Sequence, residues 1–218
     1  MELLLLSTNV ARPRLLTRLH GEDVLSGIAK KPVADANVFV GMLNIDGDEQ
    51  ADLSVHGGLH KAIYAYPTDH WPWWQGEHGL QCAPGLFGEN LTLAGADETK
   101  VRIGDRFRWG DAVLEVSEPR APCFKFAIHA NRPTAPSLLT HSGRCGWYLR
   151  VIAEGDAPAR DVLLTRIETD ETAPTVREVF TARFDPAVSL ESRRRTAATP
   201  KLAPSWRESL EKRLSSGP

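Results

Sequence analysis

Short apolar stretches separated by glycine and aspartate fill the first three quarters of the chain, and this pattern limits the fold more than any other feature. They include residues 38–40, 62–66, 101–103, 107–109, 112–116 and 147–152. Because the stretches do not alternate regularly with helical segments, as they would in a βαβ fold, they predict a closed or nearly closed β-barrel. The apolar run at residues 3–6 is expected to form a first strand that enters the core.

Two local signals place individual elements within this β-rich part. Residues 109–112, with the sequence Trp-Gly-Asp-Ala, predict a tight hairpin between two alternating strands. Residues 69–76 hold three tryptophans and predict the beginning of a short helix, with Pro72 near its start.

The composition changes near residue 172, because beyond it glycine occurs only at position 217 and helix-start patterns recur. Three short helices are predicted, beginning at Pro174 or Thr175, at Ser189, and at Ser205, where Ser205 to Glu208 resembles a capping box. Such helices form a poor core alone, so we expect them to pack on the barrel or on another subunit. The predicted fold class is therefore mainly β with α: a β-barrel domain at residues 1–168 with short flanking helices, and a small three-helix domain at residues 172–218.

Composition and charge exclude several function classes. The 218 residues carry a formal net charge of −2, which gives no general case for binding nucleic acid or a membrane. The arginine run at 193–195 is interpreted as a solvated helical face, because nearby glutamates balance it. The apolar run at residues 3–6 is too short to span a bilayer and follows no basic segment, so no signal peptide is expected. Three cysteines form neither a CxxC pair nor an even disulfide set, which favours a cytoplasmic location.

The window at residues 117–126, with the sequence SEPRAPCFKF, places Cys123 between two cations, Arg120 and Lys125. Nearby positive charge favours the thiolate, which attacks electrophiles and binds soft metals. Two prolines stiffen the approach to the cysteine. The window alone leaves two interpretations open, a reactive thiolate or a structural thiol beside two solvated cations.

A second window, at residues 50–62, holds two adjacent glycines, Gly57 and Gly58, followed by Lys61. Glycines let the backbone approach a ligand closely, and exposed amides with a lysine can bind an anion. His56 and His60 have the spacing of zinc or iron ligands on a helix, although the glycines between them disfavour a helix and no third ligand is evident. A structural turn that joins two strands is the alternative.

A third window, at residues 84–93, combines a glycine-rich loop with Asn90 and an alternating strand. Asn90 could orient a ligand or cap its own turn. Neither a Walker loop nor a GxGxxG dinucleotide motif occurs, which disfavours those nucleotide-binding folds.

Taken in order, the motifs HGGxxKA, PGxFGENLT and EPRxPCxK resemble the MOSC family, named for the C-terminal domain of molybdenum cofactor sulfurase, and most closely its bacterial YiiM-type members. These members also share a GDxQADL stretch, seen here at residues 47–53, and a short C-terminal three-helix domain. The resemblance covers nearly the whole chain. It implies a β-barrel that binds the molybdenum cofactor, a pterin whose dithiolene holds the metal and whose tail carries a phosphate.

The resemblance also assigns roles to individual residues. It makes Cys123 the protein ligand to molybdenum, in agreement with the soft-donor chemistry of a thiolate. The cofactor-binding set comprises Arg120, Lys125, Lys61, Lys30, Lys31, Gly57 and Gly58, and the substrate side is expected to hold His56, His60 and Asn90. Position 60 is His where the family often has Asp, which weakens a general-acid role for a carboxylate there. Cys82 and Cys145 lie outside the motif and are interpreted as structural.

The family resemblance implies a molybdenum-dependent oxidoreductase that removes oxygen from N-hydroxylated compounds such as hydroxylamino-purine base analogues. Since no flavin or nicotinamide fold is encoded, an external flavin-type reductase would supply electrons. The C-terminal helices could serve a homodimer. One alternative makes the chain a cofactor or sulfur carrier with a Cys123 persulfide. Another is a phosphate-bearing ligand such as pyridoxal phosphate on Lys61 or Lys125.

Overall fold

The structure is a computed structural model that describes residues 1–52 and 57–215. Its strands are β1 (Glu2–Val10), β2 (Arg14–Leu19), β3 (Glu22–Ser26), β4 (Lys31–Pro32), β5 (Asn37–Val40), β6 (Ile63–Pro67), β7 (Leu91–Ala94), β8 (Arg106–Trp109), β9 (Ala112–Pro119), β10 (Trp147–Ala153), β11 (Gly155–Pro158) and β12 (Val162–Glu168). The helices are η1 (Leu59–Lys61), η2 (Thr68–His70), α1 (Trp71–His78), α2 (Phe124–His129), α3 (Ala135–Ser142), α4 (Val176–Phe184), α5 (Leu190–Ala197) and α6 (Pro204–Ser215).

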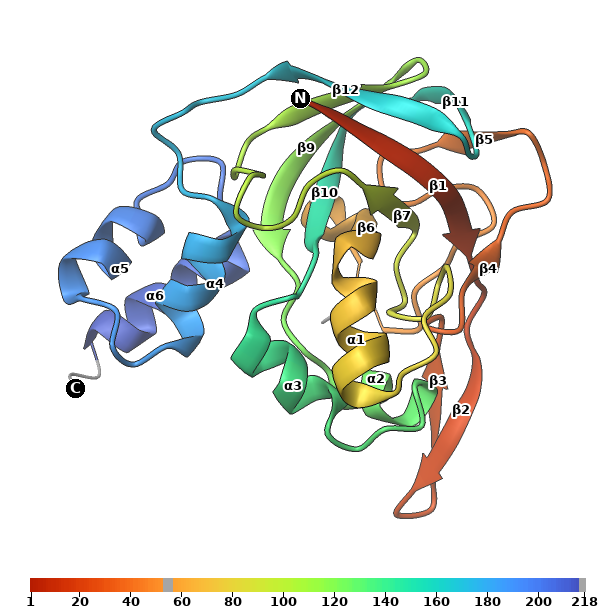
Figure 1. Cartoon of the computed structure of the whole chain (residues 1–218), viewed down its shortest axis with the longest axis horizontal. Helices are drawn as coiled ribbons and strands as arrows, with labels where there is room; N and C mark the ends of the chain where they lie inside the picture. Colours follow the sequence, from red (N-terminus) through yellow and green to blue (C-terminus); the bar gives the residue numbers. More distant parts are fainter. Residues whose placement is uncertain (53–56, 216–218) are drawn as a thin grey trace.

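Seven of these strands close into a barrel, as predicted (Figure 1). They follow one another in the order β12, β8, β9, β10, β6, β7 and β1, and β1 pairs back with β12. Strands β6 and β7 are parallel, whereas the other neighbours in the ring are antiparallel. The short strand β4 extends the sheet at the end of β1.

Alternating side chains of these strands build the core inside the barrel. In β1, Leu3 and Leu5 are buried while Leu4 is exposed, so the first strand enters the core as expected. Trp109 and Trp147 are completely buried. The predicted hairpin at residues 109–112 joins β8 to β9, with Gly110 at a positive φ of 59° in the turn. The stretch at 101–103 is not a strand, because only an isolated bridge from Arg102 to Thr175 forms there.

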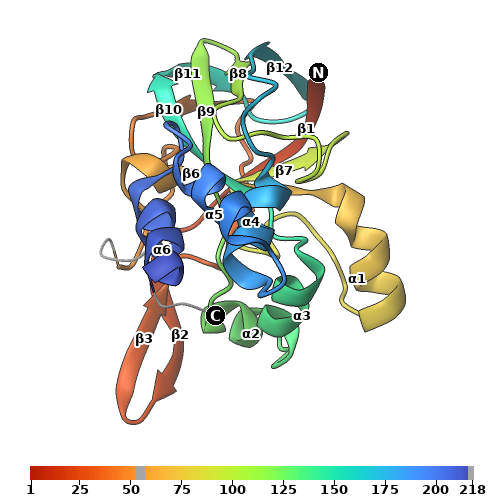
Figure 2. The same ribbon diagram turned by 90° about the vertical axis from the view of Figure 1, so that its left-hand side faces the viewer.

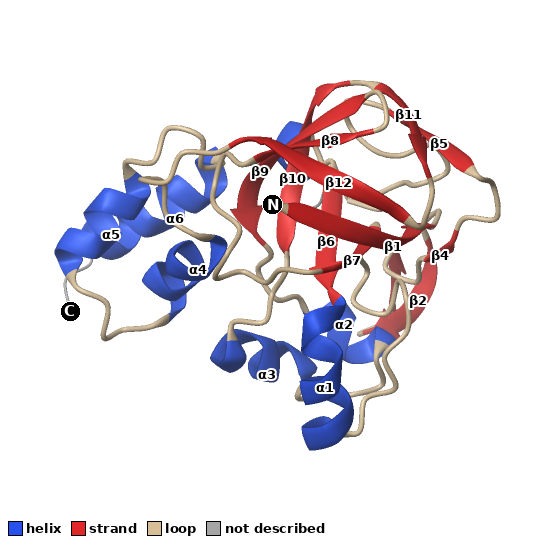
Figure 3. Ribbon diagram, turned by 45° about the horizontal axis from the view of Figure 1, so that its top comes forward, coloured by secondary structure: helices blue, strands red, loops and turns tan. Residues whose placement is uncertain are grey.

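Helices α1, α2 and α3 gather at one end of the barrel, and α4 to α6 form a separate cluster at its side (Figure 3). Helix α1 begins at Trp71 with Pro72 in its first turn, as predicted. Helices α2 and α3 were not predicted from the sequence. Within residues 1–52 and 57–215, the helices are too short or too polar to cross a bilayer.

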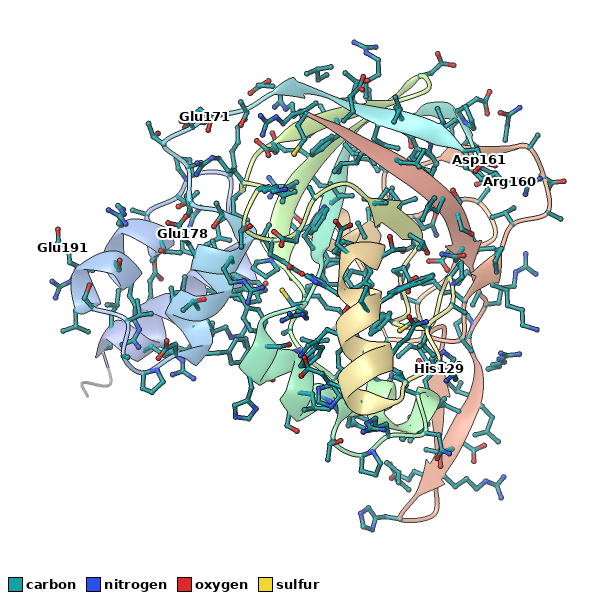
Figure 4. All side chains as sticks on the ribbon, in the orientation of Figure 1. His129, Arg160, Asp161, Glu171, Glu178 and Glu191 are labelled. Carbon is teal, nitrogen blue, oxygen red and sulfur yellow. The ribbon has the colours of Figure 1, made fainter. Side chains whose placement is uncertain are left out.

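An additional hairpin, β2–β3, projects from the barrel beside the gathered helices (Figure 2). Its tight turn has positive φ at both His20 and Gly21, the geometry that matches the twist of a two-stranded hairpin. His129 at the end of α2 lies beside this hairpin (Figure 4), and burial and the charge of Arg14 on β2 lower the pKa of its imidazole. The base of the hairpin packs against α2.

The three C-terminal helices pack on the barrel, one of the two arrangements expected. Helix α4 begins with a capping box in which Thr175 Oγ1 accepts from the Glu178 amide and Glu178 accepts from the Thr175 amide. The segment before it is held by Glu171, which pairs with Arg102 at 3.2 Å (Figure 4). Before α6, the Ala203 amide donates to the Ser117 carbonyl of β9 at 3.0 Å.

Two sequence interpretations in this region are corrected. Ser205 is not a cap, because α6 already begins at Pro204 and the Ser205 hydroxyl donates to Glu118. The arginine run is not wholly solvated, because Arg193 is buried and donates to the carbonyls of Ala182, Asp185 and Pro186 at the end of α4. Only its neighbours at 194 and 195 are exposed.

Candidate functional site

A cavity of about 880 Å³ lies where the barrel, the base of the β2–β3 hairpin and the C-terminal helices meet. This volume is in the range of small-molecule and cofactor pockets. The barrel contributes the ends of β6, β9 and β10, the loops contribute residues near 27, 50, 57 and 88, and the C-terminal cluster contributes residues of α4 and α6. The site therefore needs both parts of the chain.

Cys123 lines this cavity immediately before α2, in extended backbone with φ −134° and ψ 144°. Its carbonyl accepts the Phe126 amide at 3.0 Å, and Phe126 is completely buried. The Phe126 ring packs against Trp74 of α1 and Phe87, with centroids 6.1 and 5.3 Å away. This aromatic cluster fixes α2, so the Cys123 thiol is presented to the cavity from a defined direction.

Arg120 is a buried cation on the same wall of the cavity. Its guanidinium lies 5.1 Å from the Tyr64 ring centroid and 5.4 Å from that of Phe126, distances typical of cation–π contacts. Among the described residues it makes no ion pair with a carboxylate, and its Nη1 has no hydrogen-bond partner. Because a buried charge without a counter-ion is costly, this position favours an anionic ligand.

Lys61, at the end of η1, brings a second positive charge to the cavity. Its Nζ lies 3.7 Å from Glu118 Oε1, and both side chains line the cavity. Gly57 also lines it, in the left-handed region at φ 89°, which suits glycine. The glycine-rich segment thus places a lysine and a glycine with left-handed backbone at the cavity.

Lys30 and Asn90 line the cavity but are engaged with the protein itself. Lys30 Nζ pairs with Asp48, and burial lowers the pKa of its ammonium group. Asn90 Oδ1 accepts the Tyr64 amide at 3.1 Å, and its Nδ2 donates to Asp48 Oδ2 at 2.9 Å and to the Asn9 carbonyl at 3.2 Å. Asn90 therefore joins the loop before β7 to β1 and β6, and its amide hydrogens are already used.

Lys125 lines the cavity and holds the hairpin. Its Nζ donates to the Leu25 carbonyl of β3 at 3.1 Å. Lys125 therefore connects the segment that carries Cys123 to the base of the hairpin.

The remaining predicted residues do not join the described lining. Lys31 is exposed on β4, and Gly58 lies outside the lining although its φ is 81°. His60 also lies outside: its carbonyl accepts the Ser117 hydroxyl at 2.6 Å, and burial with the charges of Arg150 and Lys61 lowers the pKa of its imidazole. His56 falls outside the residues that the structure describes. Across the described ranges, three or more His, Cys, Asp or Glu side chains nowhere form a metal-binding group.

All three cysteines lie in the described part of the chain, and Cys123 alone lines the cavity. Burial raises the pKa of the Cys82 thiol to about 12, and raises that of the fully buried Cys145 thiol well above its usual value. Both thiols are therefore protonated near neutral pH, which fits the structural role expected for them.

Sequence reasoning missed many of the lining residues, among them Glu118, Tyr148, Arg183, Ser205 and Trp206. Glu118 stands inside a motif that we examined, and a carboxylate two residues before Arg120 could have drawn attention. Arg183, Ser205 and Trp206 come from α4 and α6, and nothing local in their sequence places them against the barrel.

Two family models match the chain. The model described as "MOSC domain" covers residues 52–169, and the model described as "YiiM-like, 3-alpha helix domain" covers residues 174–217. The first range contains the barrel strands from β6 onward but not β1, and the second range contains the C-terminal helices α4 to α6.

Individual relatives agree with these matches. The chain is 36% identical to protein YiiM of Escherichia coli K12 over 206 residues, covering 91% of this chain and 88% of that protein. It superposes on the crystal structure of YiiM from Geobacillus stearothermophilus with a TM-score of 0.80 at 32% identity, covering 97% and 99% of the two chains. It is also 37% identical over 169 residues to a protein named "Reductase" from Gibberella moniliformis, covering 75% of this chain and 30% of that one. The chain belongs to the MOSC domain family, with the C-terminal helical domain of its YiiM-like members.

Proposed function

We propose that this protein binds the molybdenum cofactor in the cavity, with Cys123 as the ligand to the metal. MOSC domains are associated with this cofactor in general, and the residues here fit it. The observation that carries the proposal is the Cys123 thiol on the cavity wall beside the buried guanidinium of Arg120, which lacks a carboxylate partner among the described residues. A thiolate suits the soft metal, and the cation suits an anionic pterin phosphate.

The other cavity residues would orient and enclose the group. Lys61 and Lys125 add positive charge, Gly57 offers a close backbone approach, and Lys30 balances Asp48 beneath the loop. Tyr148 and Trp206 add aromatic side chains to the lining.

We further propose that the reaction is reduction of N-hydroxylated compounds, with hydroxylamino-purines as the test class. The cofactor, when bound, supplies two-electron oxygen-atom transfer. The balance is R–NHOH plus two electrons and two protons giving R–NH₂ and water. An external flavin-type reductase would supply the electrons. The relative named "Reductase" supports an oxidoreductase role.

Elemental analysis tests the binding proposal directly. Protein purified from a host that makes the cofactor should contain about one molybdenum per chain, and Cys123→Ser should lose most of it while keeping its melting temperature. Cys82→Ser is the matched control, because this half-buried thiol lies outside the cavity and its loss should leave the metal in place. Equal molybdenum in both variants, or a Cys123 persulfide without metal, would refute the ligand role.

Turnover tests the reaction. Loaded protein given a reduced flavin reductase should convert a hydroxylamino-purine to the aminopurine, and the Cys123→Ser protein should not. A loaded wild-type protein without turnover would exclude this substrate class.

A further inference from the structure

One acidic residue of the cavity, Glu118, has no role in the function proposed so far. It lies near the end of β9, where the ladder with β10 shifts: Val116 pairs with Leu149 and Glu118 with Tyr148, so Ser117 is an additional residue on the β9 side. Such bulges re-aim side chains near functional sites. The side chain of Glu118 is only 2% exposed, and it lines the cavity together with Cys123.

The groups around Glu118 come from four elements outside its own strand. Lys61 of η1 places Nζ 3.7 Å from Oε1, and Ser205 of α6 donates its hydroxyl to Oε2 at 3.2 Å. The Trp206 side chain also hydrogen-bonds to the carboxylate, and Arg183 of α4 faces it. From β10, Tyr148 and Arg150 complete the titratable surroundings. The carboxyl is thus fixed in place, largely by the C-terminal domain.

This environment keeps the carboxyl partly protonated near neutral pH. Burial raises the pKa of Glu118 to about 7, while Lys61, Ser205, Trp206 and Arg183 oppose that rise. A proton donor works best when its pKa is close to the working pH.

Two other buried glutamates with different surroundings do not reach the cavity. On the same strand, Glu115 is equally buried but contacts Arg106, Arg150 and Lys201 and lies outside the cavity lining. Glu89 also has a raised pKa, but its oxygens accept the Gly85 and Phe87 amides and it does not line the cavity either.

We propose that Glu118 is the proton donor of the reaction, placed by Ser205 and Lys61 to protonate the oxygen that leaves an N-hydroxylated substrate. This inference rests on the function proposed above. Two electrons from the external flavin-type donor and two protons break the N–O bond, leaving the amine and water. Glu118 supplies one proton to the departing oxygen, and water entering from the cavity mouth supplies the other and returns the proton to Glu118.

The first test needs no substrate or cofactor. Infrared titration of the cofactor-free protein should show protonated carboxyl absorption that disappears with a midpoint near pH 7, with contributions from Glu118 and Glu89, since both have a pKa of about 7. The Glu118 contribution should be absent in Glu118→Gln, retained in Glu115→Gln, the matched control, and present alone in Glu89→Gln. A band that Glu118→Gln leaves unchanged would overturn the assignment of the acid.

The second test is the pH profile of kcat in the loaded protein. Wild-type kcat should fall tenfold per pH unit above pH 7. Glu118→Gln should lower kcat about 10²-fold and abolish this dependence on pH, while its molybdenum content stays unchanged. Glu118→Asp should restore part of the rate together with the pH dependence. Ser205→Ala should move this decrease of kcat to higher pH, because the loss of a hydrogen-bond donor to the carboxylate raises the pKa of Glu118.

The outcomes separate the two proposals. An active wild-type protein whose Glu118→Gln variant keeps the same kcat and profile overturns the proton-donor role and leaves the function standing. A loaded wild-type protein without turnover overturns the function, and the donor role with it.

Discussion

Glu89 organises the loop that precedes β7 from its centre. Its carboxylate accepts the Gly85 amide at 2.7 Å, the Phe87 amide at 3.0 Å and the Thr92 hydroxyl at 2.8 Å. Because Phe87 belongs to the aromatic cluster beneath α2, this one side chain links the loop to the segment that carries Cys123. The glutamate of the PGxFGEN motif is therefore a structural residue.

The same carboxyl gives a pH dependence of stability with a definite sign. Burial raises the pKa of Glu89 from 4.5 to about 7, so between these values the folded state keeps a proton that the unfolded state has lost. Its contribution to stability is therefore full below pH 4.5 and is lost as the pH rises through about 7. The wild-type free energy of unfolding, relative to Glu89→Gln, should fall by up to about 3 kcal/mol across this interval. Urea unfolding at several pH values measures this difference, and a constant difference would contradict the prediction.

At the scale of elements, Arg193 joins α5 to the end of α4. Its guanidinium donates to the carbonyls of Ala182, near the end of α4, and of Asp185 and Pro186, just beyond it, at distances of 3.0, 2.7 and 3.2 Å. Arg193→Ala should destabilise the protein by about 2 kcal/mol, because hydrogen bonds from a charged donor are lost and carbonyls are left buried. Arg194→Ala, at the exposed neighbouring position, should change stability by less than about 0.5 kcal/mol. Thermal unfolding of both variants measures these changes in stability. Similar losses of stability in the two variants would show that the contacts of Arg193 do not cause the destabilisation.

Elements with local signals were predictable from the sequence. In the β8–β9 hairpin, the side-chain pattern repeats every two residues along the strands on either side of a short turn. Helix α4 begins with a capping box formed by Thr175 and Glu178. The six-residue helix α2 was not predictable, because it is held by Phe126 against Trp74 and Phe87, two contacts distant in sequence. At α6, Ser205 and Glu208 predicted a capping box that does not form, because the helix already begins at Pro204.

The same division applies to the candidate site. Cys123, Arg120 and Lys125 share one short motif, so their proximity needed no tertiary information. Arg183 and Trp206 reach the cavity only because the C-terminal helices pack on β9. Hydrophobic periodicity predicts that one face of a helix is buried, but it does not identify the element that covers this face. His60 lies outside the described lining, since its place in a motif does not say which way a turn directs its side chain.

At the scale of the whole molecule, Trp206 is both a core residue of the C-terminal domain and part of the cavity wall. It is 2% exposed, packs against Phe180 and Phe184, and carries Arg183 over its ring at 4.6 Å. Domain packing and ligand enclosure therefore depend on the same side chain.

Trp206→Ala should consequently destabilise the protein by about 3–5 kcal/mol and also lower the molybdenum retained per folded chain. Leu210→Ala is the control, because Leu210 is fully buried in the same helix but lies outside the cavity lining. It should cost about 2–5 kcal/mol and keep the metal. Unfolding curves and elemental analysis of folded protein measure both effects, and equal metal loss in the two variants would rule out a direct role for the indole.

The pairing of β1 with β12 has a consequence for the order of events on the ribosome. Leu3 is opposite Leu164 in this pair, so the ring stays open until nearly all of the barrel has been synthesised. Until β12 pairs with β1, one edge of each strand has no neighbour. Pairings between strands that are far apart in the sequence form slowly. Ser205 and Trp206 emerge later still, and they finish the cavity wall. The cavity wall is thus completed only after α6 has been synthesised and has packed on the barrel, and a ligand enclosed in it marks a chain in which this packing has taken place.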